Sequence, residues 1–317
     1  MYHRVVSKVL PGAAAADGPQ PDATRQSAVR GLVRAARPKQ WAKNVLVFAA
    51  PGAAGVLSHG TDFLRALAAF LLFCLDSSGV YLLNDPVDAR ADREHPTKRF
   101  RPIAAGIVSR RTAVATAVVL MGIAIGGGTA LHWRLGLVLG IYVLVQLAYS
   151  LYLKHLPIFD LVSVAAGFVL RAIAGAVAIP VPVSQWFLIV ATFGSLLMVT
   201  GKRVAEHTDL GEGRGAHRAT LDVYSPAFLR TVLGIAAGGA AIGYALWAFS
   251  LQTAAAHHHD PIWYQLSTIP VFIALLRYPF LVEAGHGAKP EELVLADRPL
   301  QVLGACWVIL FALAIYA

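Results

Sequence analysis

The stretch "NDPVDARADREHPTKRFRPIAAG", residues 84–106, carries four acidic and five basic side chains directly after an apolar run. Such a density of charge is unusual in this chain, since only 14% of its 317 residues are charged and 57% are hydrophobic. A soluble domain usually carries about 25% charged residues. We therefore expect the stretch to lie at the end of a membrane-spanning segment, and its concentration of charge suggests that it binds a charged ligand.

Apolar runs of spanning length recur along the whole chain, and a helix needs roughly 20 such residues to cross a bilayer. We therefore predict an all-α, polytopic membrane protein in which residues 31–317 form one transmembrane domain. Residues 1–30 are rich in Ala, Pro and Gly, lack the apolar core of a signal peptide, and are expected to form a disordered tail. About nine transmembrane helices are expected, near residues 44–58, 63–83, 112–131, 135–152, 158–179, 184–200, 229–250, 262–282 and 299–317.

The basic residues are distributed very unevenly between the two sides of this topology. Nearly all of the 27 Lys and Arg fall on the side that holds the N-terminus and loops 84–111, 153–157, 201–228 and 283–298. Because basic residues collect on the cytoplasmic side, we expect an inner (plasma) membrane protein whose N-terminus and long loops are cytoplasmic. The net charge of +9 then describes a surface facing anionic lipid, and no nucleic-acid partner is expected.

The acidic residues of the opening stretch are spaced to share one helix face. If the helix of residues 63–83 continues, Asn84, Asp85, Asp88 and Asp92 fall within an arc of about 100°, with Asp85 and Asp92 nearly eclipsed. Three carboxylates on one face repel each other unless a cation lies between them. Mg²⁺ suits such a site, since it binds one or two carboxylates together with water and substrate phosphates.

A basic cluster follows the carboxylates within the same loop. Lys98, Arg99 and Arg101 supply the positive charge that a diphosphate needs, so the whole stretch predicts a site for a magnesium–diphosphate. The alternative is a solvated loop beside the membrane whose charges have no ligand. The helical spacing of the acids and the basic cluster after them together favour the site.

The pattern Asn84-Asp85-x-x-Asp88-x-x-x-Asp92 resembles the first aspartate-rich motif of the UbiA superfamily of intramembrane prenyltransferases. The flanking "DREHPTKRFRPIAAG" resembles its phosphoribosyltransferase branch, which acts on decaprenyl phosphate. The resemblance covers about residues 30–317. Pro86 departs from it, because the family usually has an aliphatic residue there. Further matching blocks are "RPKQWAKN" (37–44), "AYSLYLKH" (148–155), "VLRAIAGAVA" (169–178) and "GKRVAE" (201–206).

This resemblance implies nine transmembrane helices around a central cavity open to the cytoplasm. It also implies a donor, phosphoribosyl diphosphate, and an acceptor, a polyprenyl phosphate. The product would be polyprenyl-phosphoryl-5-phosphoribose, a precursor of the lipid-linked arabinose of mycobacterial-type cell walls. With Mg²⁺ as cofactor, Asp85 and Asp88 are the first choice as metal ligands and Asp92 the third, while Asn84 would contact a phosphate or orient a ligand.

The candidate substrate contacts are polar or basic side chains at cytoplasmic helix ends, and each has a simpler alternative. One cation of the opening stretch could face lipid. The block at 37–44 could anchor the chain at the interface with Trp41, and the block at 148–155 could hold Tyr149 at the interface. In the block at 201–206, Glu206 could form an intrahelical ion pair. The candidates are Gln40, Lys43, Asn44, Lys98, Arg99, Arg101, Tyr149, Lys154, Lys202 and Arg203. Asp160 and Arg171 are expected to pair with neighbouring helices rather than with substrate.

Two other functions remain open at this point. Prenyl transfer to an aromatic acceptor generally uses a second motif of DxxxD type, and loop 201–228 contains none. A transporter of an anionic solute would usually show duplicated halves or paired broken helices, and the acidic–basic block occurs once. The small residues "GIAAGGAAIG" (234–243) allow close helix packing, either within the chain or in a homo-oligomer.

Overall fold

The computed structural model describes residues 28–209, 220, 223–250, 262–284, 293 and 296–316, and every regular element within these ranges is helical. Residues 1–27, most of the expected tail, lie outside the described part. Residues 28–30 belong to the first turn of α1 (Ala28–Ala35), so the last three residues of the expected tail are helical. The prediction of an all-α fold is confirmed for the described residues.

Eight helices of the described part are long and apolar enough to cross a membrane, against about nine expected. Helices α11 and α12 are separated at Ser267 and together make one of these eight candidate spans. The eight are α3 (Gly60–Glu94), α4 (Arg110–Leu131), α5 (Trp133–Leu151), α6 (Phe159–Ala178), α7 (Gln185–Asp209), α10 (Pro226–Ser250), α11 with α12 (Ile262–Leu266 and Thr268–Glu283) and α14 (Arg298–Tyr316).

The segment expected at 44–58 is not a continuous spanning helix. It is divided into a 3₁₀ helix η2 (Pro38–Phe48), a short helix α2 (Ala49–Ala53) and a 3₁₀ turn η3 (Val56–Ser58). Pro51 has no N–H to donate, and Gly55 adopts a left-handed φ of 70° that ends the helical run. The first of the nine expected spans is therefore replaced by a broken segment.

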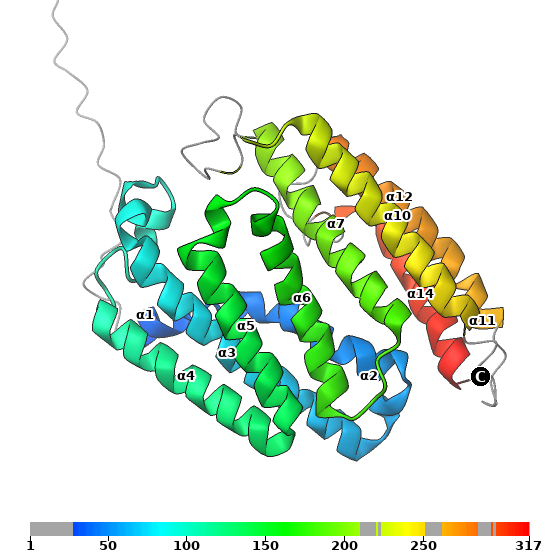
Figure 1. Ribbon diagram of the computed structural model, residues 1–317, viewed down its shortest axis with the longest axis horizontal. Coiled ribbons are helices and arrows are strands. Elements are labelled where there is room, and N and C mark those ends of the chain that lie inside the picture. Colours follow the sequence, from blue (N-terminus) through cyan, green and yellow to red (C-terminus); the bar gives the residue numbers. More distant parts are fainter. Residues whose placement is uncertain are drawn as a thin grey trace, which may run out of the picture.

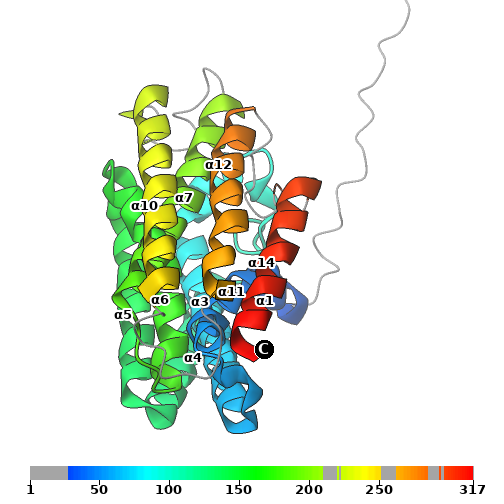
Figure 2. The same cartoon turned by 90° about the vertical axis from the view of Figure 1, so that its right-hand side faces the viewer.

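The helices alternate in direction and pack mainly against their neighbours in sequence (Figure 1). Helices α3 to α6 lie on one side of the molecule, while α7, α10, α12 and α14 lie on the other, as the turned view also shows (Figure 2). The broken segment η2 packs between α3 and α6. Gly175 of α6 makes this close approach possible, because a Cβ there would lie 1.7 Å from the carbonyl oxygen of Val47.

The small-residue face of α10 packs within the chain. A Cβ at Gly239 would lie 2.6 Å from the ring of Phe193, and one at Gly243 would lie 2.7 Å from Ile189, so both glycines seat α10 against α7. Gly234 and Gly238 of the same stretch have nothing within 4 Å of such a Cβ. Half of this face is thus used inside the chain, and a homo-oligomer stays a prediction.

Helix α3 continues unbroken past residue 83, as the spacing argument required. It runs to Glu94 with Pro86 inside it. Helix α4 begins near the same end of α3, with Ser109 as its cap: the Ser109 hydroxyl accepts from the N–H of Thr112 at 3.0 Å. Arg110 then donates to the carbonyl oxygen of Pro86 at 2.8 Å. This bond ties the start of α4 to the acidic end of α3.

Candidate functional site

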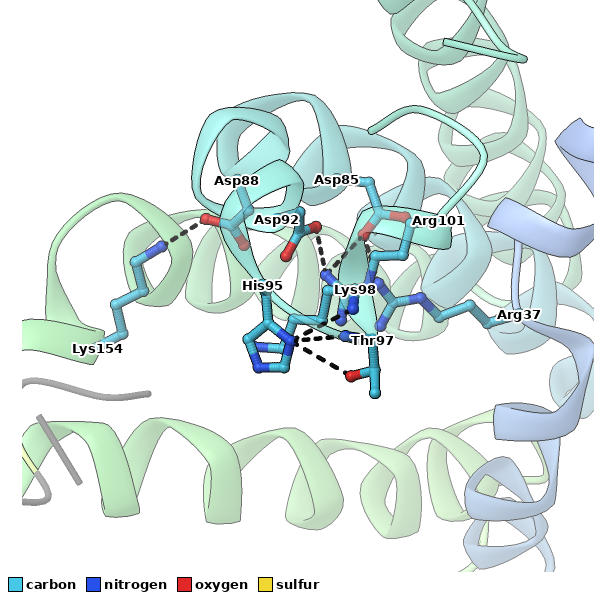
Figure 3. A network of polar contacts seen from close by, with 9 residues as sticks. All are labelled: Arg37, Asp85, Asp88, Asp92, His95, Thr97, Lys98, Arg101 and Lys154. Atoms are coloured by element: carbon cyan, nitrogen blue, oxygen red, sulfur yellow. Dashed lines mark hydrogen bonds and ion pairs between the residues drawn. The ribbon is translucent and has the colours of Figure 1, made fainter. Parts of the chain in front are cut away.

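The carboxylates of α3 form an acidic cluster, which we define as Asp85, Asp88 and Asp92. Asp85 and Asp92 share a helix face, because Nη1 of Arg101 lies 2.7 Å from Oδ2 of Asp92 and 3.6 Å from Oδ1 of Asp85 (Figure 3). Both are buried, with 2% and 4% of their surfaces exposed. The eclipsed placement deduced from residue spacing is therefore present.

Each carboxylate of the acidic cluster is paired with a cation from another part of the chain. Arg37, directly before η2, donates to Asp85. Lys154, in the turn η5 (Leu153–His155) after α5, donates to Asp88 at 2.9 Å. Figure 3 shows these cations approaching the carboxylates from different sides. The cluster is thus a meeting point of three segments that are distant in sequence.

The donor set of the acidic cluster suits Mg²⁺, and one oxygen is unused. Oδ2 of Asp85 is buried and has no hydrogen-bond partner among the described residues. Yet no group of three acidic, His or Cys side chains in the described part is close enough to hold a metal ion. The three predicted ligands therefore do not form a ready-made cage. Mg²⁺ needs only one or two carboxylates beside substrate phosphates, so Asp85 with one neighbour fits that demand.

The loop after α3 is folded around His95. Its Nδ1 accepts from the backbone N–H groups of Thr97 and Lys98 at 3.2 and 3.3 Å (Figure 3). These bonds lead into the turn η4 (Lys98–Phe100), where the guanidinium of Arg99 lies over the ring of Phe100. Of the three predicted phosphate contacts, Arg101 touches the acidic cluster, Lys98 is half-buried nearby and Arg99 is exposed.

A cavity of about 670 Å³ lies between η2, α6 and α7. Its wall is mostly apolar and includes Leu46, Phe168 and Met198. Its polar lining comes from side chains of η2, the end of α5 and the end of α7: Lys39, Gln40, Lys43, Tyr149, Ser195, Lys202 and Arg203. Five predicted substrate contacts therefore line one cavity, whose combination of cationic and apolar lining suits an amphiphilic anion.

Two further predicted substrate contacts do not line the cavity. Two other residues, one that lines the cavity and one that pairs with Asp85, were not predicted from the sequence. Asn44 is completely buried and does not line the cavity; its side chain bonds Arg171, Cys74 and Ser77. Lys154 points to Asp88 instead. The missed residues are Arg37 and Lys39. Both belong to the "RPKQWAKN" block (37–44). Residue spacing alone could not predict that Arg37 contacts Asp85.

Arg203 is held by a second polar cluster, which we call the Asp160 cluster. Asp160, fully buried, accepts from Arg203 at 3.4 Å, from the hydroxyl of Thr220 at 3.2 Å and from the hydroxyl of Tyr224. Arg203 also donates to Glu206 at 2.9 Å. Burial and the bond to Asp160 raise the pKa of Tyr224 above its ordinary value. The predicted pairing of Asp160 with a neighbouring helix is confirmed, and so is the intrahelical pair of Glu206.

Arg171 forms a third buried network, also with neighbouring elements as predicted. Its Nε donates to Asn44 at 2.8 Å and its Nη2 donates to the hydroxyl of Tyr142 at 3.0 Å. Asp76 lies within electrostatic range of Arg171, but neither of its carboxylate oxygens has a hydrogen-bond partner among the described residues. This network fixes η2 against α3, α5 and α6, and so it supports the cavity wall from behind.

Comparison with known proteins identifies the family. The model of the UbiA prenyltransferase family matches residues 45–296. The chain belongs to the UbiA prenyltransferase family. Like other members of the UbiA family, it is a multi-pass membrane protein. The match spans the acidic cluster, the Asp160 cluster and the part of the cavity wall formed by α6 and α7, while Lys39, Gln40 and Lys43 precede it.

Two curated relatives and one solved structure are similar over most of their lengths. A decaprenyl-phosphate phosphoribosyltransferase of Corynebacterium glutamicum is 46% identical, over 90% of this chain and 87% of that protein. One of Mycolicibacterium smegmatis is 44% identical, over 91% and 93%. The structure of a UbiA homolog from Archaeoglobus fulgidus bound to GPP and Mg²⁺ superposes with a TM-score of 0.66 at 18% identity, over 90% of this chain and 98% of that one. The solved structure supports the fold alone.

Proposed function

We propose that the protein transfers the 5-phosphoribosyl group of phosphoribosyl diphosphate to a polyprenyl phosphate, decaprenyl phosphate by analogy with its relatives, and releases diphosphate. The observation that carries the proposal is the cavity with a cationic and an apolar lining, in a chain 44–46% identical to decaprenyl-phosphate phosphoribosyltransferases. The product would serve as a lipid-linked sugar precursor in cell-wall assembly.

The cavity fits the acceptor because a polyprenyl phosphate also has a charged part, which the cations would bind, and an apolar part, which the apolar wall would contact. Its isoprenoid chain would lie along the apolar wall of α6 and α7, and its phosphate would meet cations such as Lys43 and Lys202. The rest of the long isoprenoid chain would extend from the cavity into the surrounding lipid. The lining therefore selects the head and the first isoprene units.

The acidic cluster fits the donor. During transfer the bond from ribose C1 to the diphosphate oxygen breaks, and C1 bonds to an oxygen of the acceptor phosphate. Cleavage gives C1 oxocarbenium character, as in glycoside transfer. When bound, Mg²⁺ would neutralise charge on the leaving diphosphate. Asp85 and Asp88 would hold it, with Asp92 behind them, while Arg101 and Lys98 would contact phosphate oxygens.

No proton has to be removed from the acceptor, because a phosphate monoester is already anionic near neutral pH. This agrees with a site of carboxylates, lysines and arginines. The side chains of the protein have three tasks: they bind two phosphate-bearing substrates, orient C1 toward the acceptor oxygen, and stabilise the charge that develops on the leaving diphosphate.

The test supplies the purified protein with ribose-labelled phosphoribosyl diphosphate and decaprenyl phosphate in one reaction. A second reaction holds a labelled prenyl diphosphate and an aromatic acceptor. We expect ribose label in the organic-soluble lipid and no prenylated aromatic product. Prenylation of the aromatic ring without ribose in the lipid would contradict the proposal and favour the ordinary prenyltransferase reaction.

The proposed orientation in the membrane places the acidic cluster on the cytoplasmic side. In a background without Cys74 and Cys306, Arg111→Cys at the start of α4 should resist an impermeant thiol reagent in intact cells. Arg134→Cys is the matched control, because both side chains are exposed at opposite ends of the α4–α5 hairpin. It should be labelled. The reverse pattern would contradict the orientation.

A further inference from the structure

Arg37 has a backbone conformation that needs an explanation. Its φ and ψ are 54° and 59°, in the left-handed region, although it is not glycine and precedes Pro38. A residue before proline normally prefers extended backbone. Such strained positions persist only when their surroundings hold them, and they gather at functional sites. In this conformation the Arg37 side chain reaches α3, where it contacts Asp85 and Tyr81.

The partners of Arg37 differ from those of the other cations around the acidic cluster. Arg37 donates to Asp85, and its guanidinium lies 4.7 Å from the centre of the Tyr81 ring, one turn before Asp85. Among the described residues its side chain has no other ion-pair partner. Arg101, in contrast, is anchored by Asp92 as well as by Asp85. Arg37 therefore depends on one carboxylate, and the positive charge of a metal ion at the unused Oδ2 of Asp85 would weaken this ion pair.

Arg37 is also placed to reach a ligand. Its side chain is 29% exposed, while the side chain of Asp85 is 3% exposed. The residues that follow it, Lys39, Gln40 and Lys43, line the cavity. Arg37 thus joins the acidic cluster to the segment η2, whose next residues line the cavity. A guanidinium suits this position, because its planar fork binds carboxylate and phosphate equally well.

We propose that Arg37 is an exchangeable donor-binding residue: it pairs with Asp85 in the metal-free protein and transfers to a phosphate of the donor when a divalent cation binds Asp85. The proposal rests on the proposed function only in requiring a diphosphate-bearing donor. The exchange keeps Asp85 neutralised when the site is empty. It also delivers a positive charge to the diphosphate at the moment the cation arrives, so that metal and donor bind cooperatively.

The proposal predicts that replacing Arg37 strengthens metal binding and weakens diphosphate binding. In Arg37→Gln, Mn²⁺ measured alone by electron paramagnetic resonance should bind more tightly, by about threefold or more, because its competitor for Asp85 is gone. Inorganic diphosphate measured by calorimetry in saturating Mn²⁺ should bind about 10- to 100-fold more weakly, since a charged hydrogen bond is lost. Arg34→Gln, which removes the same charge from an exposed position in α1, should leave both affinities unchanged.

A second variant separates exchange from a structural role. Arg37→Lys keeps the charge and should restore the Mn²⁺ affinity to the parent value, while restoring diphosphate binding only in part. Unchanged or weaker Mn²⁺ binding in Arg37→Gln would overturn the proposal, as would unchanged diphosphate binding, or failure of both variants to fold. Neither measurement uses phosphoribosyl diphosphate or polyprenyl phosphate, so their outcome is independent of the phosphoribosyl assay.

Discussion

The acidic cluster and the Asp160 cluster are built from the same residue types and differ in how completely they are satisfied. In the Asp160 cluster the carboxylate is fully buried and accepts from Arg203, Thr220 and Tyr224. In the acidic cluster the cations are 25–29% exposed, and Asp85 keeps one buried oxygen without a partner among the described residues.

The difference indicates which cluster can change partners. A buried carboxylate with several donors loses much when one is removed, so the Asp160 cluster fixes the positions of α6, α7 and the segment before α10. The cations around the acidic cluster are 25–29% exposed, so they can leave their carboxylates when a metal ion and a phosphate take their place. We therefore expect the acidic cluster to determine the reaction and the Asp160 cluster to determine the fold.

Removal of divalent metal should have the largest effect. Excess chelator should abolish phosphoribosyl transfer, and Mg²⁺ should restore it, because the leaving diphosphate needs a cation as its charge grows. Thermal unfolding of the protein should not change, since cations of the chain occupy the acidic cluster in the metal-free state. Undiminished turnover in excess chelator would contradict the assignment of a divalent metal ion to the acidic cluster.

Replacement of Asp88 should come next in size. Asp88→Asn keeps the side-chain volume but removes one charge from the acidic cluster, and it should lower kcat by on the order of 100- to 1000-fold. Glu94→Gln, an exposed charge at the end of the same helix, is the matched control and should leave kcat unchanged. Equal losses in both variants would mean that only the general negative potential matters.

Lys202 should show a smaller effect of another kind. Its side chain is 47% exposed and lines the cavity, so Lys202→Met should raise the KM for a phosphate-bearing substrate about tenfold and leave kcat nearly unchanged. Arg203→Met is not a comparable variant, because Arg203 also pairs with buried Asp160. A loss in kcat alone for Lys202→Met would contradict a ground-state binding role.

Residue spacing was enough to predict the all-α membrane fold and the shared face of the acidic residues. Long apolar runs identify spans directly, and the helical period places Asp85 beside Asp92 through Pro86. The broken segment at 38–58 was not predictable to the same degree, because its course depends on Gly175 and on the left-handed turn at Gly55, which are features of packing.

The cations of the site were only partly predictable for a related reason. Lys202 and Arg203 share a helix end and were both expected near substrate, yet only contacts with α6 reveal that Arg203 is also a buried partner of Asp160. Asn44 was expected at the substrate for its place beside Lys43, but it points into the network of Arg171. Lys43 and Asn44 are adjacent in η2, and residue spacing alone does not determine which of the two side chains faces the cavity.

The most direct test of the division between the two clusters is a pair of substitutions, Asp85→Asn and Asp160→Asn, each measured for kcat and for thermal unfolding in the same detergent. For Asp85→Asn we predict a kcat lower by about 100- to 1000-fold with little change in Tm. For Asp160→Asn we predict a loss of about 3 kcal/mol, or roughly 5–10 °C in Tm, with kcat of the folded protein within about tenfold of the parent. Unfolding of Asp85→Asn together with a stable but inactive Asp160→Asn would contradict the account.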